Sequence, residues 1–393
     1  MNKNILNTIN QEFINENINS NTADLLLKKN HHSDVDIKLL VEQIEAKKRC
    51  KTKLPTWFNT EKIYYPNKLN IEQTSSEVTA KYKSSLITGN SIIDLTGGFG
   101  IDCYYFSKKF KEVTHCEINS ELSEIVSHNY KELGVNTIET ITNDGVSQLL
   151  NNNKQYDWVY IDPSRRHDTK GKVFFLKDCL PDVPKHLNSI FNHTNNVMIK
   201  TSPLLDISVG ISELNYVKTI HVIAVNNEVK ELLWILEKGF EAETTIKTVN
   251  VNKTVEETFD FKLNEEQAIT TNFSEPLTYL YEPNAAVLKS GGFKSVSKQS
   301  NVLKLHQHTH LYTLQELVEF PGRRFKIERI LPYNKQLLKK ELHEKANIST
   351  RNFPEAVQQI RKKFKIKDGG DTYVFFTTNL HNEKIVIICK KVS

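Results

Sequence analysis

The sequence predicts an α/β protein with three regions: a helical N-terminal region at residues 1–80, a domain built on a parallel sheet at 81–265, and a small, basic α+β domain at 274–393. Three observations lead to this prediction. Apolar residues recur at helical spacing in the first region, short apolar runs alternate with longer amphipathic segments in the second, and strands alternate with helices in the third. A chain of 393 residues with 38% hydrophobic residues is also long enough for two or three domains.

The N-terminal region has the apolar spacing of amphipathic helices. Residues such as Ile14, Ile18 and Ile44 recur near helical spacing, with polar residues between them. Pro55 and Pro66 interrupt the pattern, and we expect loops at both.

The middle region alternates between strands and helices, which is typical of βαβ units around a buried parallel sheet. The predicted strands are SIIDL (91–95), EVTHCEI (112–118), YDWVYID (156–162), NVMIKTS (196–202) and TIHVIAV (219–225). Helices are predicted at 102–110, 120–133 and 176–191, and polar β-rich sequence follows at 244–263.

The C-terminal region predicts a β-α-β-α-β-β order from residue 325 onwards. Strands are expected at 325–331, 348–353, 372–379 and 384–392, and helices at 334–345 and 354–364. Pro354 stands where a first helical position would be, and Asp368-Gly369-Gly370 predicts a turn.

The charge is distributed unevenly. The net charge is +5, but residues 320–393 contain 17 Lys and Arg against 7 Asp and Glu, which leaves the rest of the chain mildly acidic. A basic domain of this kind suggests an anionic partner, and a solvated lysine-rich surface is the alternative.

Several classes of protein are disfavoured by composition. The N-terminus has no apolar segment typical of a signal peptide, and no apolar run is long enough to cross a bilayer. The five cysteines are scattered without a CxxC pair, which favours reduced thiols in a cytoplasmic protein without a metal.

The stretch SIIDLTGGFGID, residues 91–102, is the strongest local signal. A strand that ends in an acid and leads through glycines into a helix is how α/β folds bind nucleotide-like ligands. A dinucleotide-binding dehydrogenase is the alternative, but Cys103 stands close to where its third glycine is required. Asp94 and Asp102 would also repel a pyrophosphate, whereas both would attract a ligand's ammonium group.

Three further acids follow at the ends of predicted strands. Glu117 lies 23 residues after Asp94, where a carboxylate can accept both hydroxyls of a ribose. Asp144, in TNDG, could bond the amino group of an adenine, and Asp162 ends the next strand in YIDPSRR. Because ligands of open α/β sheets bind at the carboxyl ends of strands, we expect these acids around one site.

Residues 70–245 resemble the class I S-adenosylmethionine-dependent methyltransferases, a Rossmann-like fold. Asp94, Gly98 and Gly100 match the family's acid–glycine turn, while Thr96 replaces its first glycine and Gly97 is extra. The variant turn resembles that of RNA methyltransferases that modify guanine N2 in ribosomal RNA. The resemblance implies S-adenosyl-L-methionine as cofactor, held by Gln73, Ser75, Asp94, Thr96, Gly97, Gly98, Gly100, Asp102, Glu117, Asp144 and Asp162.

The segment Asp162-Pro163-Ser164-Arg165 is the predicted catalytic motif. It keeps the acid and first proline of the motif with which methyltransferases bind an exocyclic amine, but lacks the second proline and the aromatic. Asp-Pro-x-Arg also resembles uridine C5 methyltransferases, but Thr201 and Ser202 stand where those enzymes need a cysteine nucleophile. We therefore expect Asp162 to orient the acceptor or accept its proton; a structural strand-end cap is the alternative.

The whole chain resembles bacterial methyltransferase-like proteins with a THUMP-like, ferredoxin-like C-terminal domain. That resemblance implies an RNA partner, tRNA or rRNA, and no membrane. The predicted RNA-binding residues are Arg166, Arg323, Arg324, Arg361, Lys362 and Lys363. The expected activity is methylation of an RNA base; the alternatives are a non-catalytic RNA-binding protein and a small-molecule or protein methyltransferase. HQHTH at 306–310 lacks a completing Cys or acid, so we predict no metal site there.

Overall fold

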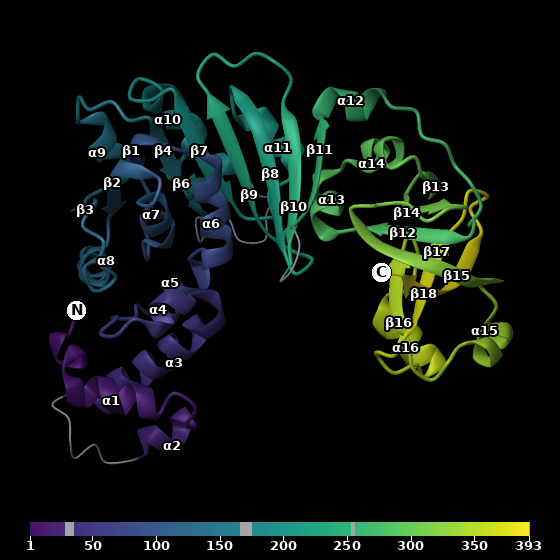
Figure 1. The fold of residues 1–393 in the computed structure, drawn as a ribbon, viewed down its shortest axis with the longest axis horizontal. Coiled ribbons are helices and arrows are strands. Elements are labelled where there is room, and N and C mark those ends of the chain that lie inside the picture. Colours follow the sequence, from purple (N-terminus) through teal and green to yellow (C-terminus); the bar gives the residue numbers. More distant parts are fainter. Residues whose placement is uncertain (28–34, 166–174, 253–255, 393) are drawn as a thin grey trace. The chain divides into compact units, whose positions relative to one another are not determined.

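The computed structural model, drawn in Figure 1, describes residues 1–27, 35–165, 175–252 and 256–392. Arg166 and His167 lie outside the described residues. The chain forms two compact units, one of Met1–Val217 with Trp234–Phe240 and one of Lys218–Leu233 with Glu241–Ser393.

The N-terminal region is helical, as predicted. Its elements are η1 (Lys3–Leu6), α1 (Thr8–Glu16), α2 (Thr22–Leu26), α3 (Ile37–Lys53), α4 (Pro55–Asn59), α5 (Lys68–Gln73) and α6 (Glu77–Leu86). The expected loop at Pro66 is present, but the one at Pro55 is wrong. Pro55 opens α4 instead, because proline has no N–H to lose in the first turn of a helix.

The N-terminal helices share a hydrophobic core with the sheet domain. Trp57 of α4 is fully buried and packs against Phe99 and Tyr104, with ring centroids 6.4 and 4.8 Å apart. The same cluster reaches from Ile5 to Tyr160. This shared core fixes α6 against the first strand and the glycine turn.

A nine-stranded sheet forms the centre of the middle region, in the order β11-β10-β8-β9-β7-β4-β1-β2-β3. Its strands are β1 (Gly89–Asp94), β2 (Phe110–Glu117), β3 (Ile138–Thr142), β4 (Trp158–Ile161), β7 (Asn196–Thr201), β8 (Val217–Val225), β9 (Glu228–Glu237), β10 (Thr245–Val251) and β11 (Glu256–Lys262). The pairs from β7 through β4, β1 and β2 to β3 are parallel. All five predicted strands are present, and β1 lies between β4 and β2.

The remaining elements of this region lie between the strands or, for α12, after the last of them, and β5 and β6 pair as a separate two-stranded sheet. They are α7 (Ile101–Phe106), α8 (Ser120–Glu132), α9 (Gly145–Leu150), β5 (Ser164–Arg165), η3 (Leu176–Asp178), β6 (Cys179–Leu180), α10 (Val183–Ile190), α11 (Ile207–Glu213) and α12 (Leu263–Ala268). The helix predicted at 176–191 is shorter, because Pro181 follows the short strand β6 and the helix begins only after Asp182, which caps it.

The C-terminal domain contains a seven-stranded sheet in the order β13-β14-β12-β15-β18-β17-β16. Its elements are β12 (Tyr279–Pro283), α13 (Ala285–Ser290), α14 (Phe293–Gln299), β13 (Leu303–His306), β14 (Thr309–Leu314), β15 (Gly322–Pro332), α15 (Lys335–Glu341), β16 (Asn347–Arg351), α16 (Val357–Phe364), β17 (Thr372–Thr378) and β18 (Lys384–Val392). The predicted order of elements from residue 325 is confirmed. Pro354 is not a first helical position, however, because α16 begins at Val357 after its N-cap Ala356.

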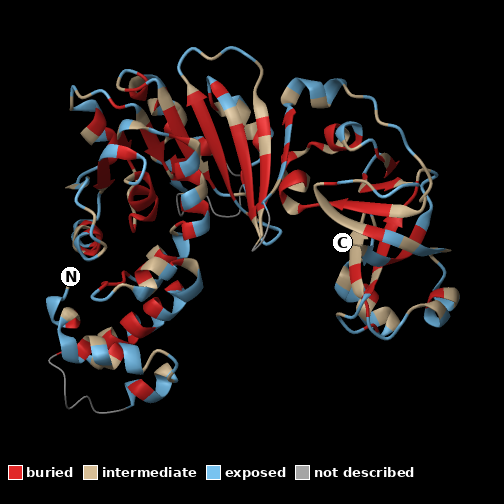
Figure 2. Ribbon diagram, in the orientation of Figure 1, coloured by how far each residue is buried: buried red, intermediate tan, exposed pale blue. Residues whose placement is uncertain are grey.

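Figure 2 shows buried residues along the strands of both sheets and exposed residues on the outer faces of the helices. In the C-terminal domain, one core cluster contains Phe325 and Phe375, and a second contains Leu338, Ile360 and Phe376. Because α15 and α16 contribute to the second cluster, their apolar residues are core and their charged residues remain outside. None of the helices within the described ranges is long and apolar enough to cross a membrane.

Candidate active site

The glycine turn joins β1 to α7, and packing explains two of its glycines. A Cβ on Gly97 would lie 2.4 Å from Nε2 of His115, and one on Gly100 would lie 2.2 Å from the hydroxyl of Tyr130. His115 is fully buried beneath the turn, and burial lowers its pKa to about 4, so the ring is neutral. The extra glycine at position 97 is therefore required by the histidine of the next strand.

Gly98 differs from these two glycines because the space beside it is open. Its φ is +57°, and an added Cβ would meet only the Thr96 carbonyl oxygen at 3.6 Å. The Gly98 N–H donates to Oε2 of Glu117 at 3.0 Å, and the neighbouring Ile118 is 73% exposed. The structure thus places an accessible backbone, a carboxylate and an apolar side chain together at the ends of β1 and β2.

Asp94 is buried at the end of β1 and is held on both oxygens. Oδ1 accepts hydrogen bonds from the Thr96 N–H at 2.8 Å and the Thr96 hydroxyl at 3.0 Å, and Oδ2 accepts one from the Cys103 thiol at 3.4 Å. Burial raises the pKa of Asp94 to about 7. The Thr96 hydroxyl also accepts a hydrogen bond from the Asp162 N–H at 2.7 Å. Thr96, the residue that departs from the usual glycine, therefore ties the glycine turn to the Asp-Pro motif.

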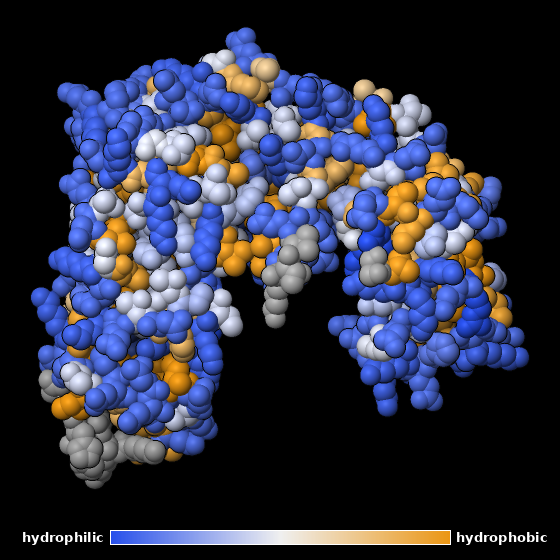
Figure 3. All heavy atoms as spheres, in the orientation of Figure 1, coloured by the Kyte–Doolittle hydropathy of each residue, from blue (hydrophilic) through white to orange (hydrophobic). Residues whose placement is uncertain are grey.

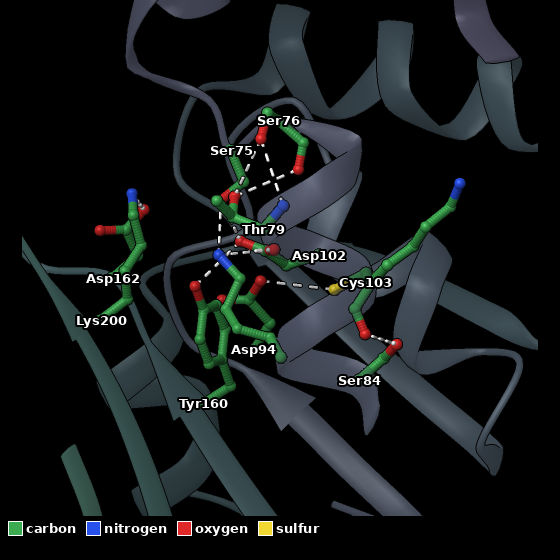
Figure 4. Close-up of polar contacts among 12 residues, drawn as sticks. Ser75, Ser76, Thr79, Ser84, Asp94, Asp102, Cys103, Tyr160, Asp162 and Lys200 are labelled. Atoms are coloured by element: carbon green, nitrogen blue, oxygen red, sulfur yellow. Dashed lines mark hydrogen bonds and ion pairs between the residues drawn. The ribbon is translucent and has the colours of Figure 1, made fainter. Parts of the chain in front are cut away.

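Asp102 belongs to a closed polar cluster (Figure 4). Its carboxylate accepts hydrogen bonds from Ser75 at 2.8 Å and Tyr160 at 2.9 Å, and it pairs with Lys83 at 2.9 Å. Lys83 is fully buried and also donates to the Ser75 hydroxyl at 2.7 Å. Burial by itself would raise the pKa of Asp102, but Lys83 and then Lys200 hold it below its ordinary value. Asp102 and Ser75 thus bond each other and the lysine of α6.

Asp162 follows β4 and forms an ion pair with Lys200 of β7, with 2.5 Å between Oδ2 and Nζ. Figure 4 shows these two side chains lying together, apart from the cluster around Asp102. The Asp162 side chain is 31% exposed and that of Lys200 is 13% exposed. This pair is therefore the accessible charged feature at the ends of the two strands.

The other predicted site residues belong neither to the Asp102 cluster nor to the Asp162–Lys200 ion pair. Asp144 is exposed and caps α9 by accepting from the Ser147 N–H at 2.8 Å, and Gln73 is exposed at the end of α5. Pro163 is buried, while Ser164 and Arg165 form the short strand β5.

The predicted RNA-binding residues of the C-terminal domain differ in their partners. Arg323 pairs with Glu282, Arg324 with Glu319, Arg361 with Asp368, and Lys363 with Glu355. Lys362 is exposed and takes part in no ion pair within the described ranges. The same holds for four further exposed lysines: Lys339, Lys340, Lys365 and Lys367. Figure 3 shows hydrophilic residues over the end of this domain formed by α15 and α16.

Two of the histidines at 306–310 contact asparagine and phenylalanine side chains. His306 contacts the side-chain amides of Asn382 at 3.0 Å and Asn352 at 3.1 Å, and His310 stacks on Phe293 with 3.5 Å between ring centroids. In the part of the chain that the structure describes, no group of three His, Cys, Asp or Glu side chains could hold a metal ion.

Sequence reasoning missed several residues of the site: Lys83, Tyr160, Lys200, His115 and Ile118. For Lys200 a signal was present, because a lysine at the end of an otherwise apolar strand must find a partner or reach solvent. Lys83 gave no comparable signal, since it looks like one more polar residue of an amphipathic helix.

Three family models match the chain. One described as conserved hypothetical protein 95 matches residues 65–210, a ferredoxin-like domain matches 279–321, and a THUMP domain-like model matches 322–391. No curated protein matches.

Among solved structures, a "putative methyltransferase" from Porphyromonas gingivalis W83 is 31% identical, with a TM-score of 0.88, and the match covers 100% of this chain and 99% of that one. One described as a putative methyltransferase from Streptococcus mutans, in complex with SAH, is 12% identical with a TM-score of 0.31, covering 41% and 96% of the two chains. One described as a putative RNA methyltransferase from Pyrococcus horikoshii is 16% identical with a TM-score of 0.34, covering 48% and 98%.

The fold and the site define a class I S-adenosylmethionine-dependent methyltransferase with a THUMP-like C-terminal domain. The full-length match at 31% identity further shows that the chain belongs to the family of the P. gingivalis protein.

Proposed function

We propose that this methyltransferase transfers the methyl group of S-adenosylmethionine to a base of RNA, either tRNA or rRNA. The observation that carries the proposal is the hydrogen bond from the Asp162 N–H to the Thr96 hydroxyl. It ties the turn that would hold the cofactor directly to the motif that would hold the acceptor. Methyl transfer is an in-line displacement, so fixing the distance between these two parts is the main task of the protein.

The residues around the glycine turn fit the cofactor. The open space beside Gly98 admits a ligand against the backbone, and Glu117 at its side can accept from ribose hydroxyls. Ile118 offers an exposed apolar surface for the adenine ring, and Asp144 lies at the end of the next strand for its amino group. Asp94 is the acid that would attract the ammonium group, since Asp102 already pairs with Lys83.

When bound, S-adenosylmethionine supplies a methyl group that bonds to the acceptor nitrogen while the carbon–sulfur electron pair stays on sulfur and the nitrogen loses a proton. Asp162 would orient the acceptor by taking a hydrogen bond from it, and would take up or pass on the released proton. Gln73 and Ser75 begin the segment that precedes α6; Ser75 supports Asp102 from there.

The C-terminal domain would bind the RNA backbone. Its net charge of +10 from residue 320 onwards suits a sequence-independent phosphate contact, as do its exposed lysines that form no ion pair among the described residues, such as Lys340, Lys362 and Lys365. The proposed RNA-binding residues with acidic partners, such as Arg361, would have to exchange an ion pair for a phosphate.

The test of the whole proposal is mass spectrometry of modified nucleosides in total RNA from cells with and without the gene. A methylated nucleoside that disappears with the gene and returns with wild type but not with Asp162→Ala supports it. Titration calorimetry tests the cofactor half: wild type should bind S-adenosylmethionine and Asp94→Ala should bind it more weakly.

Two other outcomes correspond to different functions. If RNA binds with unchanged affinity to wild type and Asp162→Ala but neither incorporates methyl, the protein is an RNA-binding scaffold. If methyl is transferred to a protein or small molecule in a cell extract treated with ribonuclease, RNA is not the substrate.

A further inference from the structure

We propose that Lys200 and Asp162 read the acceptor base together, with Lys200 donating a hydrogen bond to the atom beside the nitrogen that receives the methyl group. This inference rests on the proposed function and extends it to the recognition of the acceptor. It starts from the two lysine–carboxylate pairs at the strand ends, which differ in their exposure.

The pair of Lys83 with Asp102 is closed. The two side chains are 0% and 10% exposed; Ser75 and Tyr160 both donate to Oδ2 of Asp102, and the Lys83 ammonium lies 2.9 Å from Oδ1. An ion pair that is buried in this way is poorly placed to meet a ligand, and removing either partner would leave an uncompensated charge.

The pair of Lys200 with Asp162 is open. Its side chains are 13% and 31% exposed, and the main chain of Asp162 is fixed separately by Thr96. Within the described residues, Oδ2 of Asp162 is bound by Lys200 while Oδ1 accepts no hydrogen bond. An accessible carboxylate with one oxygen engaged and one free can accept a further N–H without losing its first partner.

An ammonium 2.5 Å from a carboxylate offers one donor and one acceptor side by side. The hydrogen-bonding edge of a nucleobase presents the complement, an N–H next to a ring nitrogen or a carbonyl oxygen. A hydroxyl can also donate to the carboxylate and accept from the ammonium, but it does so through a single oxygen, whereas a base edge meets the two groups with two adjacent atoms. The pair also brings no net charge toward the cationic methyl donor, because the charge of Lys200 is balanced by Asp162.

The match of two adjacent atoms to the two groups therefore favours a nitrogen on the edge of a base over a sugar hydroxyl.

The experiment compares wild type, Lys200→Met, Lys200→Gln, Asp162→Asn and the double variant Lys200→Met/Asp162→Asn. Methyl transfer to total RNA from cells lacking the gene is the activity, and calorimetry gives the Kd for S-adenosylmethionine. The matched control is Lys154→Met, which breaks an ion pair with Glu112 on the surface.

Lys200→Met should lower the rate of methyl transfer at saturating cofactor at least tenfold, while the Kd for the cofactor changes less than twofold. The double variant should be no slower than Asp162→Asn alone, because the two residues act on the same group. Lys200→Gln keeps a hydrogen-bond donor without the charge and should retain part of the rate of methyl transfer. It therefore tests the inference even if Lys200→Met does not fold.

A Lys200→Met rate within twofold of wild type overturns the inference, as does a double variant whose loss is the product of the single losses. If Lys200→Met does not fold, a folded Lys200→Gln as inactive as Asp162→Asn overturns it instead. If wild type methylates no RNA, the proposed function is wrong. If wild type and Lys200→Met methylate RNA at equal rates, only the inference about Lys200 is wrong.

Discussion

Asp94 shows how burial of one residue can link cofactor binding to pH. Its pKa of about 7 means that it carries a proton part of the time at neutral pH in the free protein. A cofactor ammonium beside it would favour the ionised form, so binding should release protons near pH 7 and tighten as pH rises from 6 to 8. Calorimetry in two buffers of different ionisation enthalpy measures this release. Asp94→Asn should abolish it, and heats that do not depend on the buffer in wild type would contradict the prediction.

Gly97 gives a second prediction at the residue scale. A methyl group there would lie 2.4 Å from Nε2 of His115 and 2.7 Å from the carbonyl oxygen of Cys116, so the backbone of the turn must shift. We expect Gly97→Ala to cost about 1–3 kcal/mol, as other overpacked positions do, and to weaken cofactor binding. Gly134→Ala is the comparison, because Gly134 has a left-handed φ of +69° and nothing within 4 Å, so its methyl group adds backbone strain without the clash expected at Gly97. A Gly97→Ala melting temperature equal to that of wild type would contradict this explanation of Gly97.

At the scale of elements, Lys83 connects α6 to α7 through Asp102. Lys83→Met would leave a buried carboxylate without its cation, which in other proteins costs about 3–5 kcal/mol. Adding Asp102→Asn should recover part of that loss, because the uncompensated charge is then gone. Lys154→Met removes a half-exposed pair and should cost at most about 1 kcal/mol. Urea unfolding followed by circular dichroism measures all three, and a double variant less stable than Lys83→Met would contradict the pairing.

At the scale of elements, the sequence predicts most strands but not which strands are neighbours in the sheet. The apolar runs predicted the five strands, because a buried parallel strand must be apolar on both faces. Strand β9 was missed although Asn226 and Asn227, both with positive φ, join it to β8 as a two-residue hairpin turn. Asp94, Glu117 and Asp162 could be predicted as strand-end acids. The partnership of Asp162 with Lys200 could not, because it depends on β4 and β7 being neighbours in the sheet.

At the scale of the whole molecule, the proposed function predicts that RNA affinity depends on lysines rather than on the arginines of the C-terminal domain. Lys362, Lys365 and Lys367 are exposed and, among the described residues, form no ion pair, whereas Arg361 is bound to Asp368. An unpaired lysine can release a phosphate counterion without first breaking a contact.

Replacing these three lysines by glutamine should therefore weaken binding of total tRNA and reduce the slope of log K against log salt by up to about 3. Arg361→Gln should change the slope by less than one of these lysines does. Fluorescence anisotropy of labelled RNA, titrated at salt concentrations between about 50 and 200 mM, measures the affinity and its salt dependence. If the triple variant keeps the wild-type slope, these lysines do not bind the RNA. That result would contradict the proposed role of this domain but not the proposed methyltransferase site.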